Sequence, residues 1–244
     1  MDNKRNADSR IPLYMQLKQA IKDEIQNGAW PLNTAIPTEQ ELSGRFSVSR
    51  ATVRQAVSEL VNEGLLVRQQ GRGTFVSKPK IETSLRNFYS FTEDMIAQGR
   101  QPGSIVLEFE IVMPKPAVAE KLELTSNELV IKFIRLRLVD GDVIMLETTY
   151  LPHSLFPNLT QEDVTLHSLY SLMEERYGMK VQKAVESFEP VLVDPFASKL
   201  LEVSAGSPAL FLERIGSLAN GKKLELSQSI VRGDRCRYIV EMLR

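Results

Sequence analysis

The sequence predicts an α+β protein of two domains, a small helical domain followed by an antiparallel sheet domain with flanking helices. Its length of 244 residues suits two domains better than one. The first part holds three amphipathic helix patterns and then a glycine-rich hairpin, whereas the rest alternates between strand and helix patterns with hairpin turns. Strands joined by hairpins pair antiparallel, and we expect the helices to pack to one side of them.

The composition is that of an ordinary globular protein, with 43% hydrophobic and 25% charged residues. Apolar stretches are short, and the N-terminus lacks the apolar run of a signal peptide, so we expect a cytoplasmic protein without a membrane partner. Cys236 is the single cysteine, and His153 and His167 are too few for a metal site without carboxylates. We therefore expect no disulfide, no metal and no cofactor, and an inert Cys236 in or near a strand.

Positive charge is concentrated in the first part of the chain. Residues 1–78 carry 11 Lys/Arg and 8 Asp/Glu, whereas residues 79–244 carry 19 and 23. Between Arg45 and Lys80 there are seven basic residues and only two acidic ones, Glu59 and Glu63. A local basic excess of this size indicates a small nucleic-acid contact surface.

Two helices are predicted before residue 47. Apolar residues at helical spacing run from Pro12 to Asn27, and Gly28 ends this pattern. Thr38 and Glu41 then form a capping box, in which Thr38 caps the helix and Glu41 reaches back to it. We expect this second helix to end at about Phe46.

A third helix begins after Ser49, which is a good N-cap. Its apolar residues fall on one face, at Val53, Ala56, Val57, Leu60 and Val61. The opposite face presents Arg50, Arg54 and Ser58, with Ala51 and Thr52 beside them at the helix start. Small and basic residues at this position are typical of a recognition helix in the DNA major groove.

A hairpin follows the third helix. Residues 65–69 and 74–77 are predicted strands around the tip Gln70-Gly71-Arg72-Gly73, where the glycines allow positive φ. Arg72 between them can meet phosphate or enter the minor groove. The order of these elements predicts a winged helix-turn-helix, and the alternative is a small three-helix domain whose arginines are merely solvated.

The same residues carry a family resemblance, through Ile36-Pro37-Thr38-Glu39-Gln40-Glu41-Leu42, Val48 to Ala56, Glu63-Gly64-Leu65 and Gly71 to Val76. This stretch closely resembles the DNA-binding domain of GntR-family bacterial regulators. The resemblance implies DNA contacts by Arg50, Arg54 and Gly71 and phosphate contacts by Ser49 and Thr52, whereas Gln40 departs from the usual Arg. The full set that we predict to contact DNA is Thr38, Gln40, Ser49, Arg50, Ala51, Thr52, Arg54, Gly71, Arg72 and Gly73.

The domain boundary is expected at the polar, proline-containing segment Ser77-Lys78-Pro79-Lys80. We assign residues 1–77 to the DNA-binding domain, 78–83 to a linker and 84–244 to the sheet domain. Beyond the linker, strands are predicted at 105–113, 129–138, 143–150, 180–193, 209–218, 223–232 and 238–242. Helices are predicted at 91–98, 117–122, 168–177 and 195–201.

Two arginines share one face of a predicted strand, because Arg135 and Arg137 are two residues apart and strand side chains alternate. Facing strands supply Glu147 and Glu225. One interpretation is a salt-bridged, half-exposed sheet surface. The other is a pocket in which the arginines bind a phosphate or carboxylate and the glutamates accept hydrogen bonds from ligand hydroxyls.

The second domain resembles the UTRA ligand-sensing domain of the HutC subfamily, which shares the chorismate lyase fold. The segments that fit are Ser90 to Met95, Arg135-Leu136-Arg137, Glu147 to Pro152, Ser168-Leu169-Tyr170 and Arg232 to Arg235. By similarity to amino-sugar regulators that respond to hexosamine phosphates, the anion would be held by Arg135, Arg137, Ser168 and Tyr170, and the rest of the ligand by Phe91, Thr92, Glu147 and Glu225. Val231 departs from an aromatic residue of those relatives.

These features together predict a transcription regulator that binds a palindromic operator as a homodimer and responds to a small anionic effector such as a sugar phosphate. The resemblance implies a repressor that the effector releases from DNA. The alternatives are an enzyme of chorismate-lyase-like fold and an activator with a carboxylate effector. We expect no enzyme and no catalytic residue, because the chain has no Ser/His/Asp set and no glycine-rich phosphate loop, and fold does not imply function.

Overall fold

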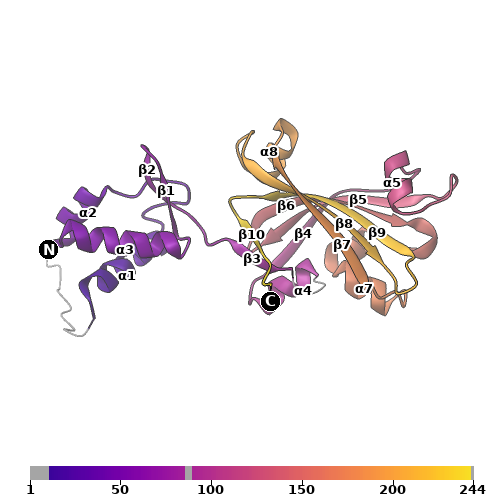
Figure 1. Cartoon of the computed structure of the whole chain (residues 1–244), viewed down its shortest axis with the longest axis horizontal. Helices are drawn as coiled ribbons and strands as arrows, with labels where there is room; N and C mark the ends of the chain where they lie inside the picture. Colours follow the sequence, from indigo (N-terminus) through magenta and orange to yellow (C-terminus); the bar gives the residue numbers. More distant parts are fainter. Residues whose placement is uncertain (1–10, 86–89, 243–244) are drawn as a thin grey trace. The chain divides into compact units, whose positions relative to one another are not determined.

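The chain divides between Lys80 and Ile81 into two units (Figure 1). A computed structural model describes residues 11–85 and 90–242. The expected linker extended to residue 83, but residues 81–84 form a strand that belongs to the second unit. This strand was missed because it is four residues long and its partner lies at the opposite end of the sequence. The outer ends of the expected domains, residues 1–10 and 243–244, lie outside the described residues.

The first unit has the three helices and the hairpin expected from the sequence. The helices are α1 (Leu13–Gln26), α2 (Glu39–Phe46) and α3 (Arg50–Asn62), and the hairpin strands are β1 (Leu66–Gln69) and β2 (Gly73–Val76). Strands β1 and β2 pair antiparallel, with Leu66 opposite Val76 and Gln69 opposite Gly73. Residues of all three helices and both strands are buried in one core, which includes Ile21, Leu42 and Leu60. This core fixes the face of α3 that remains exposed.

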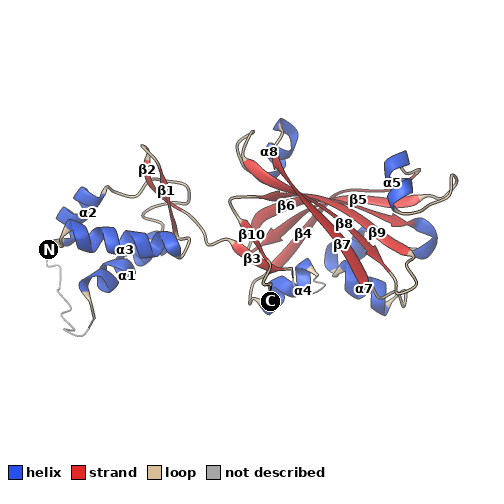
Figure 2. Cartoon of the chain, in the orientation of Figure 1, coloured by secondary structure: helices blue, strands red, loops and turns tan. Residues whose placement is uncertain are grey.

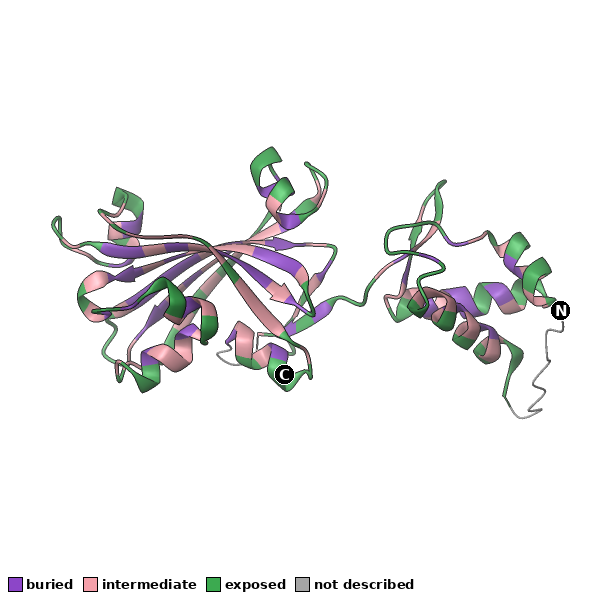
Figure 3. Ribbon diagram, turned by 180° about the vertical axis from the view of Figure 1, so that it is seen from behind, coloured by how far each residue is buried: buried purple, intermediate pink, exposed green. Residues whose placement is uncertain are grey.

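The second unit is built on a six-stranded antiparallel sheet (Figure 2). The strand order is β4-β5-β6-β9-β8-β7, with β4 and β7 at the edges. The strands are β4 (Pro102–Val112), β5 (Val130–Val139), β6 (Asp142–Pro152), β7 (Lys183–Leu192), β8 (Pro208–Ser217) and β9 (Lys223–Arg232). The central strands carry most of the buried side chains (Figure 3).

Helices cover both faces of this sheet, which corrects the expectation that they pack to one side (Figure 1). Both faces carry apolar side chains, because Val130 and Phe133 of β5 are each fully buried but on different faces. One face packs against α4 (Phe91–Ala97), α6 (Gln161–Leu166) and α7 (Leu169–Glu175), and the other against α5 (Pro116–Lys121) and α8 (Pro195–Leu201). A short 3₁₀ helix, η1 (His153–Leu155), follows β6. Helix α6 was not predicted from the sequence, although Thr160 and Asp163 form a capping box at its start.

A separate two-stranded parallel ribbon joins the two ends of the second unit. It consists of β3 (Ile81–Ser84) and β10 (Cys236–Ile239), which pair with Ile81 opposite Cys236. Strand β10 begins two residues before the predicted strand at 238–242, because the chain reverses at once after β9. Among the helices of residues 11–85 and 90–242, none is both long and apolar enough to span a bilayer.

Candidate nucleic-acid interface and candidate ligand cavity

The N-terminal turn of α3 presents its polar side chains to solvent. Ser49 caps the helix by accepting a hydrogen bond from the Thr52 backbone N–H at 3.1 Å, and its hydroxyl also lies 2.8 Å from the Thr52 hydroxyl. Arg50, Ala51 and Arg54 are exposed. Because Val53 and Val57 bury the other face of the helix, these side chains are held outward.

Two arginines of this region share one carboxylate. Glu39, at the start of α2, accepts two hydrogen bonds from the Arg54 guanidinium, both at 3.2 Å, and lies 3.9 Å from the Arg68 guanidinium of β1. Arg50 has no hydrogen-bond or ion-pair partner within the described part of the chain. The face therefore offers one fully available guanidinium, Arg50, and two that the half-exposed Glu39 carboxylate holds weakly.

The remaining predicted DNA-contacting residues lie at the start of α2 and at the hairpin tip. Thr38 is exposed and occupied in a capping box, in which its backbone N–H donates to Glu41 Oε2 at 2.8 Å. Gln40 is exposed beside it. At the tip, Gly71 and Gly73 have φ of 71° and 120°, so the chain reverses there without steric cost. The Arg72 guanidinium between them lies 5.8 Å from the centre of the Phe75 ring.

The second unit contains a mostly closed cavity on the face of the sheet that α4 and α7 cover. Its lining comes from β3, α4, the central sheet strands, α7 and β10, and consists of Ile81, Thr83, Ser90, Phe91, Thr92, Asp94, Arg135, Arg137, Met145, Glu147, Thr149, Leu169, Tyr170, Leu212, Arg214, Glu225, Ser227, Ser229, Cys236 and Tyr238. The cavity volume is about 50 Å³. Pockets for small ligands usually measure about 300–1,000 Å³, so a ligand of that class enters only after side chains move.

Strand register explains why these polar side chains meet. Arg135 lies opposite Glu147, which lies opposite Ser229, so one row of the sheet runs from arginine to carboxylate to hydroxyl. In the next row Thr149 lies opposite Ser227, and Ser227 lies opposite Arg214. Residues directly opposite in a sheet share a face, and both rows therefore point into the cavity.

Two of the three cavity arginines are paired with carboxylates. Arg135 forms an ion pair with Glu147, and Arg214 forms one with Glu186 of the edge strand β7. Arg214 also donates to the Tyr170 hydroxyl at 2.9 Å, and that hydroxyl donates to Glu225 Oε1 at 2.8 Å. A continuous chain of polar groups thus runs from the sheet edge to Glu225.

Arg137 is the exception among these arginines. Its guanidinium donates to the Thr92 hydroxyl at 2.7 Å and stacks 4.5 Å from the centre of the Phe91 ring, but its Nε has no partner in the residues the structure describes. Burial and the neighbouring Arg135 lower the pKa of Arg137 to about 9, so it is still a cation at neutral pH. A buried cation without a carboxylate partner is stabilised by a nearby anion, so Arg137 is a candidate anion-binding residue.

The cavity also gathers polar atoms that lack hydrogen bonds. Among the described residues, four of the six buried side-chain atoms without a partner belong to its lining, namely Asp94 Oδ2, Arg137 Nε, Thr149 Oγ1 and Glu225 Oε2. Such atoms are rare in folded proteins, because each costs about 1–3 kcal/mol if it stays unsatisfied. Their concentration in one cavity makes it the candidate ligand site of the second unit.

The pKa values of two cavity carboxylates, Glu147 and Glu225, shift in opposite directions. Burial raises the pKa of Glu225. Burial also opposes ionisation of Glu147, but Arg135 and Arg137 outweigh it and hold the pKa of Glu147 below its ordinary value. Burial and the nearby Glu225 keep Tyr170 protonated, with its pKa raised well above the ordinary value. The two carboxylates therefore offer the ligand different partners.

The structure brings together seven of the eight predicted effector residues around this cavity: Phe91, Thr92, Arg135, Arg137, Glu147, Tyr170 and Glu225. Ser168 is not in the lining. It caps α7, and its hydroxyl lies 3.4 Å from the Ser90 hydroxyl. Val231 is fully buried in a cluster with Met145 and Leu212. The Tyr170 hydroxyl is hydrogen-bonded to Glu225 and Arg214.

Sequence reasoning missed Asp94, Thr149, Arg214, Ser227 and Ser229, which also line the cavity. Strand alternation was a usable signal for three of them, since Thr149 is two residues from Glu147, and Ser227 and Ser229 follow Glu225 at the same spacing. Arg214 has no such neighbour in the sequence. Only the pairing of β8 with β9 places it in the cavity.

Comparison with known proteins agrees with the two-unit architecture. The family described as bacterial regulatory proteins, gntR family, matches residues 13–76, and the UTRA domain matches residues 97–237. The chain is 35% identical over 239 residues to the HTH-type transcriptional repressor NagR of Bacillus subtilis, covering 98% of each chain. It is 30% identical over 232 residues to a probable fructoselysine utilization operon transcriptional repressor of Escherichia coli, covering 95% of each. The crystal structure of PhnF from Mycobacterium smegmatis superposes with a TM-score of 0.71 at 30% identity, covering 95% of this chain and 99% of that one.

Proposed function

This chain belongs to the gntR family of bacterial regulatory proteins and carries a UTRA domain, and on that premise we propose that it is a transcriptional repressor that a small anionic ligand releases from DNA. The two similar proteins of Bacillus subtilis and Escherichia coli named above are described as transcriptional repressors. Residues 1–77 would read DNA, and the unit beyond the linker would bind the ligand and hold two copies together. A dimer suits this role, because a single recognition helix covers only a few base pairs and two-fold proteins read inverted repeats.

The observation that carries the ligand proposal is the set of unpartnered polar atoms in the cavity. Arg137 supplies a cation for an anionic group, and Asp94 Oδ2 is an acceptor that requires a hydrogen-bond donor. Glu225 Oε2 accepts a hydrogen bond when the carboxyl is ionised and can donate one when it is protonated. The Thr149 hydroxyl can serve as either. A ligand that satisfies all four atoms has an anion at one end and several hydroxyl or ammonium groups elsewhere.

A phosphorylated sugar or amino sugar has this combination of groups. Guanidinium groups bind phosphate through paired hydrogen bonds, and the Arg135 guanidinium lies on the same strand face as Arg137 to provide a second one. The ligand would compete with Glu147 for Arg135, since that ion pair is present in the ligand-free cavity. Ligand binding therefore rearranges the cavity, which its small volume also requires.

Calorimetric titration of the full chain with hexose and hexosamine 6-phosphates tests this proposal. We expect binding by at least one of them and its loss in the variant Arg135→Ala/Arg137→Ala. The control is Arg176→Ala, which removes an arginine whose ion pair with Asp163 lies outside the cavity lining. Equal binding by the parent and the double variant would exclude this cavity, and binding of aromatic carboxylates alone would exclude the ligand class.

A further inference from the structure

Three elements of the DNA-binding unit meet at one carboxylate. Glu39 is the first residue of α2, and its side chain is half-exposed. Its Oε2 accepts both hydrogen bonds from the Arg54 guanidinium of α3, whereas its Oε1 lies 3.9 Å from the Arg68 guanidinium of β1. One negative charge therefore lies between two cations, one from the recognition helix and one from the hairpin.

Arg68 is also tied directly to the recognition helix. Its guanidinium donates to the Ser58 hydroxyl of α3 at 2.9 Å, and Ser58 follows Arg54 by about one helical turn. The Arg68 side chain is 48% exposed, and that of Arg54 is 69% exposed. Both guanidinium groups therefore belong to the exposed surface beside α3, although Arg68 is not among the residues predicted from the sequence to contact DNA.

The fold depends little on the Glu39 carboxylate. The capping box at the start of α2 uses Thr38 and Glu41 rather than Glu39. The helix dipole favours a negative charge in the first turn, but ion pairs at exposed positions contribute little to stability. The main effect of Glu39 is therefore on the two arginines beside it.

This carboxylate distinguishes between the two kinds of group that DNA offers. Phosphates present only acceptor oxygens, so they repel Glu39, and an arginine binds them only by leaving its ion pair. In a G·C base pair, by contrast, guanine accepts hydrogen bonds from a guanidinium while cytosine N4 donates to a carboxylate. The Arg54–Glu39 pair therefore penalises backbone contacts more than base contacts, and such an unfavourable element produces specificity.

We propose that Glu39 is a specificity-determining residue of the DNA-binding surface, because it restrains Arg54 and Arg68 from binding phosphate on non-specific DNA. The inference rests on the DNA-binding role of the first unit, and it adds Arg68 as a phosphate-binding residue that the carboxylate holds back. In the parent, the Arg68 guanidinium is shared between Glu39 and Ser58. Without the carboxylate charge, this guanidinium is available for one further phosphate contact.

The variant Glu39→Gln tests this restraint, since it removes the charge and keeps the shape. Fluorescence anisotropy measures the Kd of the full chain for a duplex of scrambled sequence at several salt concentrations. We expect non-specific binding to be at least threefold tighter at low salt, and the slope of log Kd against log salt to be steeper by about one, because one phosphate contact is gained. Arg68→Gln in the Glu39→Gln background should return the slope to that of the parent.

The matched control is Glu63→Gln, which removes the same charge from the same unit. Glu63 also lies between two cations, Lys18 at 2.5 Å and Lys22 at 2.8 Å, but neither is a predicted DNA contact. We expect the salt dependence of this variant to equal that of the parent. An unchanged slope in Glu39→Gln, or an equal increase in Glu63→Gln, would overturn the inference. A slope that stays steep in the double variant would exclude Arg68 as the phosphate-binding residue.

Selection from a pool of random duplexes gives the second test. The parent and Glu39→Gln each select a preferred sequence, and the Kd for that sequence is compared with the Kd for scrambled DNA. We expect this specificity ratio to be at least threefold smaller for Glu39→Gln, while thermal unfolding shows a similar Tm for both proteins. Equal ratios would contradict the inference and leave the proposed function standing, whereas a parent that selects no sequence would overturn both.

Discussion

The arginines of the cavity differ in their ion-pair partners. Arg135, Arg137 and Arg214 are all buried arginines on one sheet face, but only Arg137 lacks a carboxylate partner among the described residues. A guanidinium already paired with a carboxylate must release it before it binds a ligand. Arg137 can bind an anion without that loss, and we expect it to contribute most of the anion affinity.

The first prediction concerns Arg137→Ala. The variant should lose about 1.5–3 kcal/mol of binding free energy for a sugar phosphate, which is at least tenfold in Kd. Calorimetric titration measures the loss, and the Arg176→Ala variant should bind like the parent. A change of less than threefold in Arg137→Ala would show that another group holds the anion.

The second prediction concerns the pH dependence of stability through Glu225. Because burial raises the pKa of Glu225 in the folded chain, Glu225 stays protonated just above pH 4.5, about its ordinary pKa. In the unfolded chain the same carboxyl has already released its proton at that pH. The contribution of Glu225 to stability is therefore lost as pH rises through this window. Glu225→Gln removes that loss and still accepts the Tyr170 hydrogen bond.

Thermal unfolding of the parent and Glu225→Gln between pH 4.5 and 8 checks the sign. The Tm difference should move in favour of Glu225→Gln as pH increases. Parallel curves over the whole range would mean that Glu225 titrates in the folded chain as it does in the unfolded one.

The third prediction separates two arginines of the DNA-binding unit. Arg50→Ala should cost about 1–3 kcal/mol of specific binding, because it removes a base contact in the major groove. Arg72→Ala should weaken specific and non-specific binding alike and reduce the dependence of log Kd on log salt by about one. Fluorescence anisotropy with operator and scrambled DNA at several salt concentrations measures both effects. Equal operator affinity of Arg50→Ala and the parent would show that the recognition-helix assignment is wrong.

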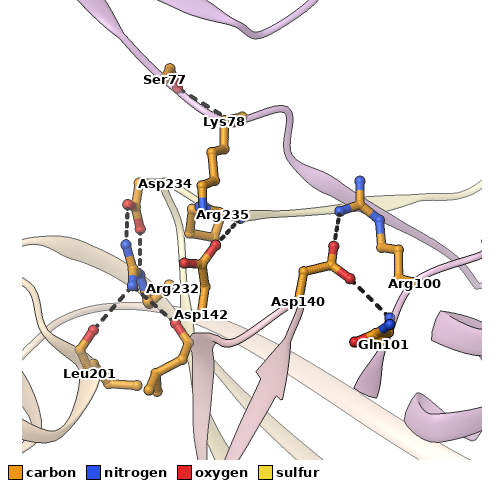
Figure 4. Close-up of polar contacts among 11 residues, drawn as sticks. Ser77, Lys78, Arg100, Gln101, Asp140, Asp142, Leu201, Arg232, Asp234 and Arg235 are labelled. Carbon is orange, nitrogen blue, oxygen red and sulfur yellow. Dashed lines mark hydrogen bonds and ion pairs between the residues drawn. The ribbon is translucent and has the colours of Figure 1, made fainter. Parts of the chain in front are cut away.

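At the scale of elements, the turn between β9 and β10 requires a residue without a Cβ at Gly233, which lies between Arg232 and Asp234 (Figure 4). A Cβ at Gly233 would lie 2.7 Å from the Pro208 carbonyl oxygen, and this neighbour is backbone that cannot rotate away. The fourth prediction is that Gly233→Ala destabilises the second unit by about 1–3 kcal/mol, as other overpacked sites do. Urea unfolding should show a lower midpoint, and an unchanged midpoint would mean that the turn can shift freely.

Elements with local signals were predictable from the sequence. The start of α2 was predicted from Thr38 and Glu41, and the start of α3 from Ser49, because capping uses residues three positions apart. Strands β5 and β6 were predicted from alternation and the turn at Asp140-Gly141, where both residues have positive φ.

Elements that depend on distant partners were not predictable. Strand β3 has a four-residue pattern and exists only because β10 pairs with it from the far end of the chain. The same limit applies to Arg214, which enters the cavity through the register of β8 against β9. The position of Arg135 and Arg137 on one strand face was predicted. The ion pair between Arg135 and Glu147 was not predictable, because it depends on the register of β5 against β6.

At the scale of the whole molecule, one chain combines two binding events, DNA binding by the first unit and ligand binding by the second. The DNA-binding unit offers an exposed Arg50, and the second unit offers a cavity with four unsatisfied polar atoms. These events are coupled only if the ligand has different affinities for the DNA-bound and free arrangements, and a tenfold effect requires about 1.4 kcal/mol of coupling. One charge-assisted contact to Arg137 is sufficient for this.

The most direct test of this coupling is titration of the preformed operator complex with glucosamine 6-phosphate. The account predicts that DNA is released, with an operator Kd at least tenfold weaker at saturating ligand, and that Arg135→Ala/Arg137→Ala keeps its DNA affinity without this response. Operator binding that ligand leaves unchanged in the parent, or an undiminished response in the double variant, would contradict it.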